Sequence, residues 1–148
     1  MSGSFIKVKK MIRSAGAIIF AKKKYLLQLR ENKKNIYYQG FWGVFGGLLE
    51  KNEGFEKGLE REVKEETNLD VKTTKMVLSN NFKFFDYKIR YRIYFECKVL
   101  GKNQINLSEG KSFKFHSFKE IKKLNVVPLD FAAIYYHHLY INKKRYIP

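Results

Sequence analysis

The chain has 148 residues, of which 45% are hydrophobic and 16% aromatic, and this is enough for one domain with a sizeable core. Its longest apolar runs, such as AGAIIFA, are too short to span a bilayer, and no basic segment followed by a long apolar one opens it. These features disfavour a membrane or exported protein, so we expect a soluble, cytoplasmic one. The single cysteine, Cys97, excludes an internal disulfide, and its strand-like setting predicts an inert, buried thiol.

The charge is distributed unevenly along the chain. The 30 Lys and Arg residues outnumber the 14 Asp and Glu residues, which gives a net charge of +16. Residues 50–70 nevertheless hold eight acids and four bases, whereas the other 127 residues hold six acids and 26 bases. An acidic segment within a basic surface suits a protein that holds divalent cations and attracts a phosphate-rich substrate. Compositional drift toward lysine would give the same basic surface without a function.

The first predicted elements form a hairpin, a loop and a short strand. Residues 11–21 alternate weakly before becoming apolar, and residues 25–30 read as a second strand after a lysine-rich turn. A polar loop over 31–40 leads into a short strand around 41–45 and the pair Gly46 and Gly47. From Phe55 onward, apolar residues recur every four positions, which predicts an amphipathic helix of about 14 residues.

The remaining segments mix strands and helices. In chain order we predict a strand over 71–78, a turn at Asn80–Asn81, one or two strands over 82–100, a polar loop over 101–110, a short strand over 111–118, a short basic helix over 118–124 and a final helix from about Asp130 to Ile141. There are no internal repeats or linkers. We therefore expect a loose lead-in over residues 1–10 and a single α/β domain over 11–148.

The run REVKEE places three carboxylates on the predicted helix, at Glu62, Glu65 and Glu66. Residues three and four apart share a helix face, where like charges destabilise an isolated helix. Mg²⁺ prefers oxygen ligands, and carboxylates on one rigid helix supply them at fixed separations. A solvated helix face whose acids pair with Lys57 and Lys64 is the alternative interpretation of the spacing alone.

The segment that contains this run resembles the Nudix box, G-x5-E-x7-R-E-U-x-E-E-x-G-U with U apolar. Eight of its nine defined positions match, namely Gly47, Glu53, Arg61, Glu62, Val63, Glu65, Glu66 and Leu69, whereas Asn68 replaces the last glycine. The resemblance covers about a sixth of the chain and implies the Nudix fold, an α/β/α sandwich with a mixed β-sheet between helices. It also implies Mg²⁺ as cofactor, with Mn²⁺ as a substitute.

The resemblance implies roles for the residues of the box. Glu62, Glu65 and Glu66 would be metal ligands together with the carbonyl of Gly46. Glu62, in preference to Glu65, would polarise the attacking water, so both are candidate catalytic residues.

Other positions of the box would be structural. Gly47 would shape the loop, and Glu53 and Arg61 would form a buried ion pair that ties this loop to the helix. Asn68 is the next best residue after glycine for a left-handed helix end. Phe45 stands where many members have proline, which leaves the substrate subclass open.

Two further residues outside the box are candidates. Glu109 lies in the loop LSEGKSFKF, where the resemblance implies one more catalytic or metal-binding glutamate, against an ordinary loop acid. Arg30 ends the second predicted strand, where members of the family contact substrate phosphate, and a guanidinium can bind phosphate oxygens bidentately. A surface arginine is the alternative there.

Aromatic and polar residues near the box are candidates for substrate binding. Tyr37, Tyr38, Phe41 and Trp42 could stack on a nucleobase, with Trp42 as the principal candidate, although aromatic residues at a strand start more often belong to the core. Asp130 lies where some members read the base, but an aspartate just before an apolar helical run is also a good N-cap. The cap is the favoured interpretation of Asp130. The three histidines lack metal-ligand spacing and are assigned no chemistry.

Together these features predict Mg²⁺-dependent hydrolysis of a phosphoanhydride bond in a nucleoside diphosphate linked to another moiety, such as a nucleoside triphosphate, ADP-ribose or a nucleotide sugar. A non-hydrolytic nucleotide- or RNA-binding module is one alternative, but a pure binder does not need three clustered ligands. Hydrolysis at carbon, as in GDP-mannose-type glycosyl hydrolysis, is another. The expected partner is a nucleotide-like small molecule, RNA is not favoured, no membrane is involved, and homodimers are common among relatives.

Overall fold

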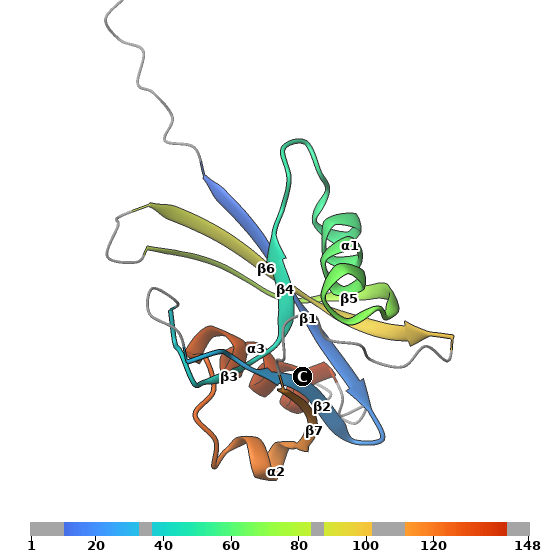
Figure 1. Cartoon of the computed structure of the whole chain (residues 1–148), viewed down its shortest axis with the longest axis vertical. Coiled ribbons are helices and arrows are strands. Elements are labelled where there is room, and N and C mark those ends of the chain that lie inside the picture. Colours follow the sequence, from blue (N-terminus) through green and yellow to red (C-terminus); the bar gives the residue numbers. More distant parts are fainter. Residues whose placement is uncertain (1–10, 33–36, 84–87, 102–111, 142–148) are drawn as a thin grey trace, which may run out of the picture.

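The computed structural model describes residues 11–32, 37–83, 88–101 and 112–141. The expected lead-in over residues 1–10 and Glu109 lie outside these ranges. The described residues form one mixed sheet with helices on both sides (Figure 1). No helix among them is both long enough and apolar enough to cross a membrane.

The elements follow the predicted order closely. They are β1 (Ile12–Ala21), β2 (Lys24–Leu29), β3 (Trp42–Gly43), β4 (Phe45–Leu48), α1 (Phe55–Thr67), β5 (Asp70–Lys83), β6 (Ile89–Leu100), β7 (Ser112–Ser117), α2 (Phe118–Ile121), α3 (Pro128–Tyr136) and the π-helix η2 (His137–Ile141). Lys22 and Lys23 have positive φ angles of 50° and 63°, which matches the tight two-residue turn of a hairpin. The predicted hairpin, amphipathic helix and late strand are confirmed.

β1 occupies the centre of the sheet and pairs with three other strands. It pairs antiparallel with β2 at one end and with β4 along its middle, and it runs parallel to β6. The main path of the sheet is β3-β2-β1-β6-β5, with β7 pairing with β2. Because β4 leads directly into the loop before α1, its pairing with β1 fixes the start of the Nudix-like segment against the centre of the sheet.

Two apolar cores lie on opposite faces of the sheet. The period-two alternation of β1 sends Ala15, Ala17 and Ile19 into one core together with Leu59 of α1. Ile18 points the other way, into a core that includes residues of α2 and α3. In Figure 1, α1 accordingly lies apart from the α2 and α3 pair, with strands between them. This arrangement confirms the predicted α/β/α sandwich.

Two details of the predicted elements are wrong. The turn predicted at Asn80–Asn81 lies within β5, where these residues pair with Arg92 and Tyr91 of β6. Asparagine favours turns locally, but the long antiparallel pairing with β6 overrides that preference, and register shifts near Thr73 and Met76 accommodate it. The final helix also begins two residues earlier than predicted and changes to a π-helix at its end.

The buried thiol agrees with its expectation. Cys97 lies in the core on the α1 side and is 2% exposed. Burial raises the pKa of its thiol to about 12. A thiol with that pKa stays protonated near neutral pH, so it is a poor nucleophile.

The change from α3 to η2 is anchored by a buried histidine. His137 Nδ1 lies 2.8 Å from the hydroxyl of Tyr25, and its Nε2 lies 2.6 Å from a carboxylate oxygen of Glu96. Because a carboxylate only accepts hydrogen bonds, Nε2 donates and Nδ1 accepts from the tyrosine, which fits a neutral ring. Burial lowers the pKa of His137. Burial opposes ionisation of Glu96, yet hydrogen bonds from His137 and Thr74 hold its pKa below the ordinary value.

We predict that this network makes the fold sensitive to mild acid. Because the pKa of His137 is lower in the folded state, the fold favours the neutral ring. Its contribution to the unfolding free energy is complete above the unfolded pKa of about 6.5, and it is lost as the pH falls through the folded pKa. His137→Gln should therefore flatten the decline of unfolding free energy between about pH 7 and pH 5. Urea denaturation across this range measures the slope. His138→Gln, at a half-exposed neighbour stacked on Phe118, is the control, and equal slopes in the two variants would contradict the prediction.

Candidate active site

Helix α1 is held in place by its apolar face and its C-terminal cap. Leu59 and Val63 are fully buried in the core on that side of the sheet. Asn68 forms the cap with φ 65° and ψ 8°, and its backbone N–H donates to the carbonyl of Lys64. Asparagine therefore adopts the left-handed conformation for which glycine is usual, and the departure from the motif leaves the helix end intact.

The predicted ion pair joins the loop to the helix. Arg61 Nε lies 2.7 Å and Nη2 2.9 Å from the two carboxylate oxygens of Glu53. Hydrogen bonds from Arg61 and from the backbone N–H of Glu50 lower the pKa of Glu53 to about 2. Arg13 of β1 adds hydrogen bonds to the carbonyls of Glu50 and Glu53. The loop before α1 is thereby fixed to both the helix and the sheet, although the ion pair is half-buried rather than fully buried.

The two glycines of β4 allow very close packing. Gly46 has φ +152°, and a Cβ there would lie 2.1 Å from the carbonyl oxygen of Ala15. A Cβ on Gly47 would lie 2.6 Å from a carboxylate oxygen of Glu62. Side chains at either position would displace the neighbouring strand or the glutamate. Phe45 is fully buried in the core and anchors the strand that carries both glycines.

We predict that Gly46→Ala destabilises the chain by roughly 2–4 kcal/mol, because backbone strain and overpacking against β1 act together. The unfolding midpoint in urea measures the effect. Gly54→Ala is the matched control, since a Cβ at Gly54 meets nothing within 4 Å and its φ is −73°. Similar midpoints for the two variants would show that the close approach of Gly46 to Ala15 is unimportant.

The three clustered glutamates lie in different environments. The Glu62 side chain is 18% exposed beneath the glycines, and burial, with repulsion from Glu65, raises its pKa. Glu65 is 59% exposed and pairs with Arg61 Nη1 at 3.1 Å. Glu66 lines the pocket described below, and its Oε2 is shielded from solvent. Two of the three carboxylates are therefore sheltered, and the third is turned outward.

These oxygens fit a hard divalent cation in chemical type. Mg²⁺ is bound through one or two carboxylates and keeps several waters, and Glu62 and Glu66 with the adjacent Gly46 supply such donors. Within the described residues, however, no three side chains of His, Cys, Asp or Glu are grouped closely enough to hold a metal. Glu65 could join only after leaving Arg61, and opening an exposed helix pair of this kind costs about 0.3–0.5 kcal/mol.

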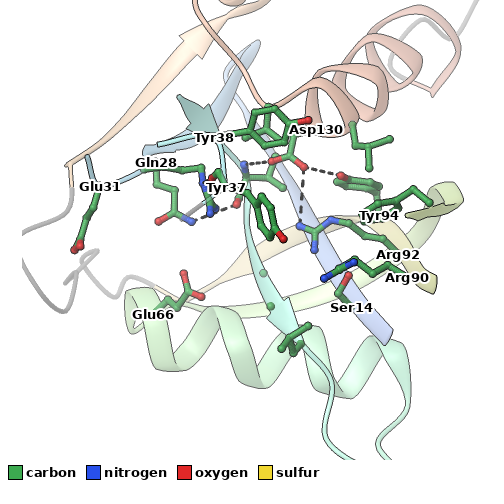
Figure 2. Close-up of a pocket in the computed structure, with 18 residues that line it drawn as sticks. Ser14, Gln28, Glu31, Tyr37, Tyr38, Glu66, Arg90, Arg92, Tyr94 and Asp130 are labelled. Atoms are coloured by element: carbon green, nitrogen blue, oxygen red, sulfur yellow. Dashed lines mark hydrogen bonds and ion pairs between the residues drawn. The ribbon is translucent and has the colours of Figure 1, made fainter. Parts of the chain in front are cut away.

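A pocket of about 660 Å³ opens between the α1 side and the α3 side of the molecule (Figure 2). Glu66, Gly46 and Gly47 line one part of it, so the Nudix-like segment contributes directly to its wall. Arg30 also lines the pocket, and its Nε donates to the carbonyl of Tyr37 at 2.9 Å.

The aromatic candidates divide into two groups. Tyr37 and Tyr38 line the pocket. Trp42, the principal candidate, is not among the described lining residues; its ring packs edge-on against His116 with centroids 4.6 Å apart. The interpretation as core therefore holds for Trp42, because β3 pairs with β2 and directs this ring toward the α3-side core.

Asp130 lines the pocket and does not cap α3. The helix begins at Pro128, its N-cap is Val127, and no side chain makes the cap hydrogen bond. One oxygen of the buried Asp130 carboxylate accepts from the Val44 N–H at 3.0 Å, and the other accepts from the Tyr94 hydroxyl at 2.5 Å. The favoured interpretation as a cap is thus wrong, because the helix starts earlier and points this side chain inward.

Reasoning from the sequence missed the pocket residues of β6. Arg90, Arg92 and Tyr94 alternate along this strand and all line the pocket. Arg92 Nη2 lies 4.0 Å from the Asp130 carboxylate, and its guanidinium lies 4.9 Å from the centre of the Tyr94 ring. Two arginines at alternate positions of a strand lie on the same face of the sheet, and that pattern could have identified this wall.

Comparisons with known proteins agree with this geometry. The NUDIX domain family matches residues 10–136. The DNA mismatch repair protein MutT (family Nudix hydrolase) of methicillin resistant Staphylococcus aureus 252 is 33% identical, over 86% of this chain and 95% of that one, with a TM-score of 0.69. The E. coli ORF135 protein is 21% identical, over 93% and 96% of the two chains, with a TM-score of 0.77.

A third solved structure is the NUDIX domain of Shewanella oneidensis NrtR, complexed with ADP ribose. It is 15% identical, over 90% of both chains, with a TM-score of 0.71. At this identity the NrtR domain, like the ORF135 protein, shows the shared fold alone. No curated protein matches the sequence. Because the family match spans most of the sequence and the MutT protein is 33% identical over most of both chains, the chain belongs to the Nudix family of hydrolases.

Proposed function

We propose that the chain hydrolyses a phosphoanhydride bond in a nucleoside diphosphate linked to another moiety, with Mg²⁺ as cofactor. The observation that carries this proposal is the composition of the pocket wall. Glu66, the glycines of β4 and Arg30 all line one cavity, so an acidic and a basic side chain belong to the same site. A diphosphate needs both, because cations must neutralise its charge and donors must hold its oxygens.

The residues of α1 and β4 take distinct parts in this proposal. Glu62, Glu66 and the carbonyl of Gly46 would hold Mg²⁺, and Glu65 would join after turning from Arg61. The bound ion supplies charge neutralisation and acidifies a water. Glu62 is the preferred residue to receive the proton of the attacking water. Its sheltered position beneath the glycines of β4 would place its carboxylate close to a water held by that ion.

Arg30 and the tyrosines would position the substrate. Arg30 is oriented by its hydrogen bond to the carbonyl of Tyr37, which leaves the Nη groups of its guanidinium to donate to phosphate oxygens. Tyr37 and Tyr38 can stack on a base. Water attack on phosphorus would give a nucleoside monophosphate and a second phosphorylated fragment. ADP-ribose, the ligand of the NrtR domain, has the required diphosphate linkage and is therefore one candidate.

A substrate panel tests this proposal. Purified protein with Mg²⁺ is incubated with nucleoside triphosphates, ADP-ribose, dinucleoside polyphosphates, nucleotide sugars and capped RNA, and products are separated by anion-exchange chromatography. Phosphorylated products from at least one class are expected, and chelation with EDTA should stop their release. Reaction in water enriched in ¹⁸O should place the label on phosphate. Label on the sugar carbon would show hydrolysis at carbon, and no product from any class would overturn the proposal.

A further inference from the structure

Gln28 is a buried polar residue that lines the pocket and takes no part in the proposed chemistry. It is 7% exposed and lies on β2, where its register partners are Gly43 of β3 and Phe113 of β7. Because β2 is paired on both sides at this point, the backbone of Gln28 is held in place. Its side chain extends from the strand into the group of lining residues in Figure 2.

One hydrogen bond fixes the orientation of the Gln28 amide. Nε2 donates to the carbonyl of Val44 at 3.3 Å. A carbonyl only accepts, so the nitrogen is the end that faces Val44 and Oε1 is the other end. The Val44 peptide is itself held from its N–H side by Asp130 at 3.0 Å. The amide therefore cannot turn over without losing its bond to a fixed peptide.

The acceptor Oε1 of Gln28 has no partner in the part of the chain that the structure describes. The bond to Val44 is the one hydrogen bond that this side chain makes there. Oε1 nevertheless keeps some contact with solvent, unlike the shielded Oε2 of Glu66. Gly43, directly opposite on β3, has no side chain to cover the amide. Since buried polar groups are generally satisfied, a donor on a ligand in the pocket would complete the hydrogen bonding of Gln28.

The uncharged lining residues suit a flat, weakly polar ligand. They include the aliphatic Val44, Val127 and Leu129 and the aromatic Tyr37 and Tyr38. Arg30, the proposed phosphate contact, lies two residues beyond Gln28 on β2 and so on the same face of the strand. A nucleobase presents its ring faces to apolar and aromatic side chains and only its edge to polar atoms. The base of a nucleotide whose phosphate meets Arg30 therefore fits beside Gln28.

We propose that Gln28 is a specificity-determining residue whose Oε1 accepts a hydrogen bond from the exocyclic amino group of the substrate base. An amino group has two hydrogens, which can serve Oε1 and a second acceptor, and the carboxylates that line the same pocket only accept. A carbonyl oxygen in that position would place two acceptors face to face and leave both unpaired. Adenine and cytosine nucleotides are then preferred over hypoxanthine and uracil nucleotides. The kinetic part of this inference rests on the proposed hydrolysis.

Metal-free binding tests the role of Gln28. The full chain in EDTA is titrated calorimetrically, up to millimolar concentrations, with AMP and IMP and with CMP and UMP. Each pair contrasts an amino base with its oxo counterpart. The amino member of at least one pair should bind about five- to fiftyfold more tightly, and Gln28→Leu should bring this ratio toward one. Equal affinities in both pairs, a preference for the oxo member, or no binding of any of the four would overturn the proposal.

Two further variants separate recognition from a merely structural role. Gln28→Glu, like Gln28→Leu, loses the N–H that donates to Val44, but it keeps an acceptor in place of Oε1 and should retain the amino preference. Equal loss of the preference in both variants would overturn the proposal. Gln39→Leu makes the same change at an exposed glutamine outside the described lining residues. It should keep the full ratio, and unfolding midpoints show whether each variant folds.

Kinetics distinguish this inference from the proposed function. With Mg²⁺, kcat/KM is compared for the amino and oxo members of the substrate class that reacts, such as ATP with ITP and CTP with UTP. A higher kcat/KM for the amino member supports both proposals. An amino preference in binding without hydrolysis of any compound would overturn the proposed function and keep the role of Gln28. Hydrolysis with no binding preference would do the reverse.

Discussion

Glu66→Gln is expected to lower kcat by roughly two to four orders of magnitude while the chain still folds. The substitution keeps the shape of the side chain but removes its charge, and a bound cation contributes several kcal/mol of transition-state stabilisation. Glu66 lines the pocket and has a solvent-shielded oxygen, so another acid cannot readily replace it. Steady-state kinetics on the best substrate of the panel measure the loss.

Glu56→Gln is the matched control for this prediction. Glu56 lies in the first turn of the same helix and is exposed, so its replacement should leave kcat within about twofold, as surface changes usually do. Mg²⁺ should raise the unfolding temperature of the unaltered protein and of Glu56→Gln, because a ligand of the native state stabilises it. It should do so much less in Glu66→Gln. Normal turnover in Glu66→Gln would show that this carboxylate is not a ligand.

The helix and its motif could be predicted because their signals are local. The four-residue recurrence of Phe55, Leu59 and Val63 determines which face of α1 is buried. The pairing of Glu53 with Arg61 follows from the resemblance to a motif whose spacing is also local. Asn68 could be placed at the helix end from conformational preference alone.

The pocket wall on the α3 side could not be predicted, because it depends on contacts between distant residues. The residues around Asp130 in the sequence predict an N-cap. Its carboxylate instead accepts hydrogen bonds from Val44 and Tyr94, which are 86 and 36 residues away in the chain. The long pairing of β5 with β6 likewise overrides the local turn preference of Asn80 and Asn81. Such contacts are set by packing of the whole sheet against α3, and no short pattern contains them.

The outward position of Glu65 is also set by a side-chain contact in the folded chain and not by its spacing in the sequence. Its spacing from Glu62 suggests a shared ligand set, but Arg61 attracts it to the exposed side of α1. The same arginine binds Glu53, so one guanidinium serves both the loop and the helix. A cation that took Glu65 as a ligand would have to compete with this exposed pair, and opening such a pair costs little.

Replacing Asp130 with alanine should destabilise the chain by about 3–5 kcal/mol, since removing one partner of a buried charge pair leaves the other uncompensated. Arg92 loses its carboxylate, and the Val44 N–H and the Tyr94 hydroxyl lose their acceptor. Asp130→Asn keeps an acceptor oxygen but no charge, so it should cost less, about 1–3 kcal/mol. The unfolding free energy from urea titration measures both values.

The order of three variants shows what the Asp130 carboxylate contributes. Tyr94→Phe removes one hydrogen bond to Asp130 and keeps its charge and its contact with Val44, so it should be the mildest, at about 1–2 kcal/mol. Asp130→Asn should follow, and Asp130→Ala should be the most severe. If Asp130→Ala and Asp130→Asn both left the unfolding free energy unchanged, the carboxylate would stabilise neither the position of β4 nor that of Arg92. Val44 directly precedes β4, which carries the two glycines. Loss of Asp130 should therefore also destabilise the position of β4, on which the proposed metal ligands depend.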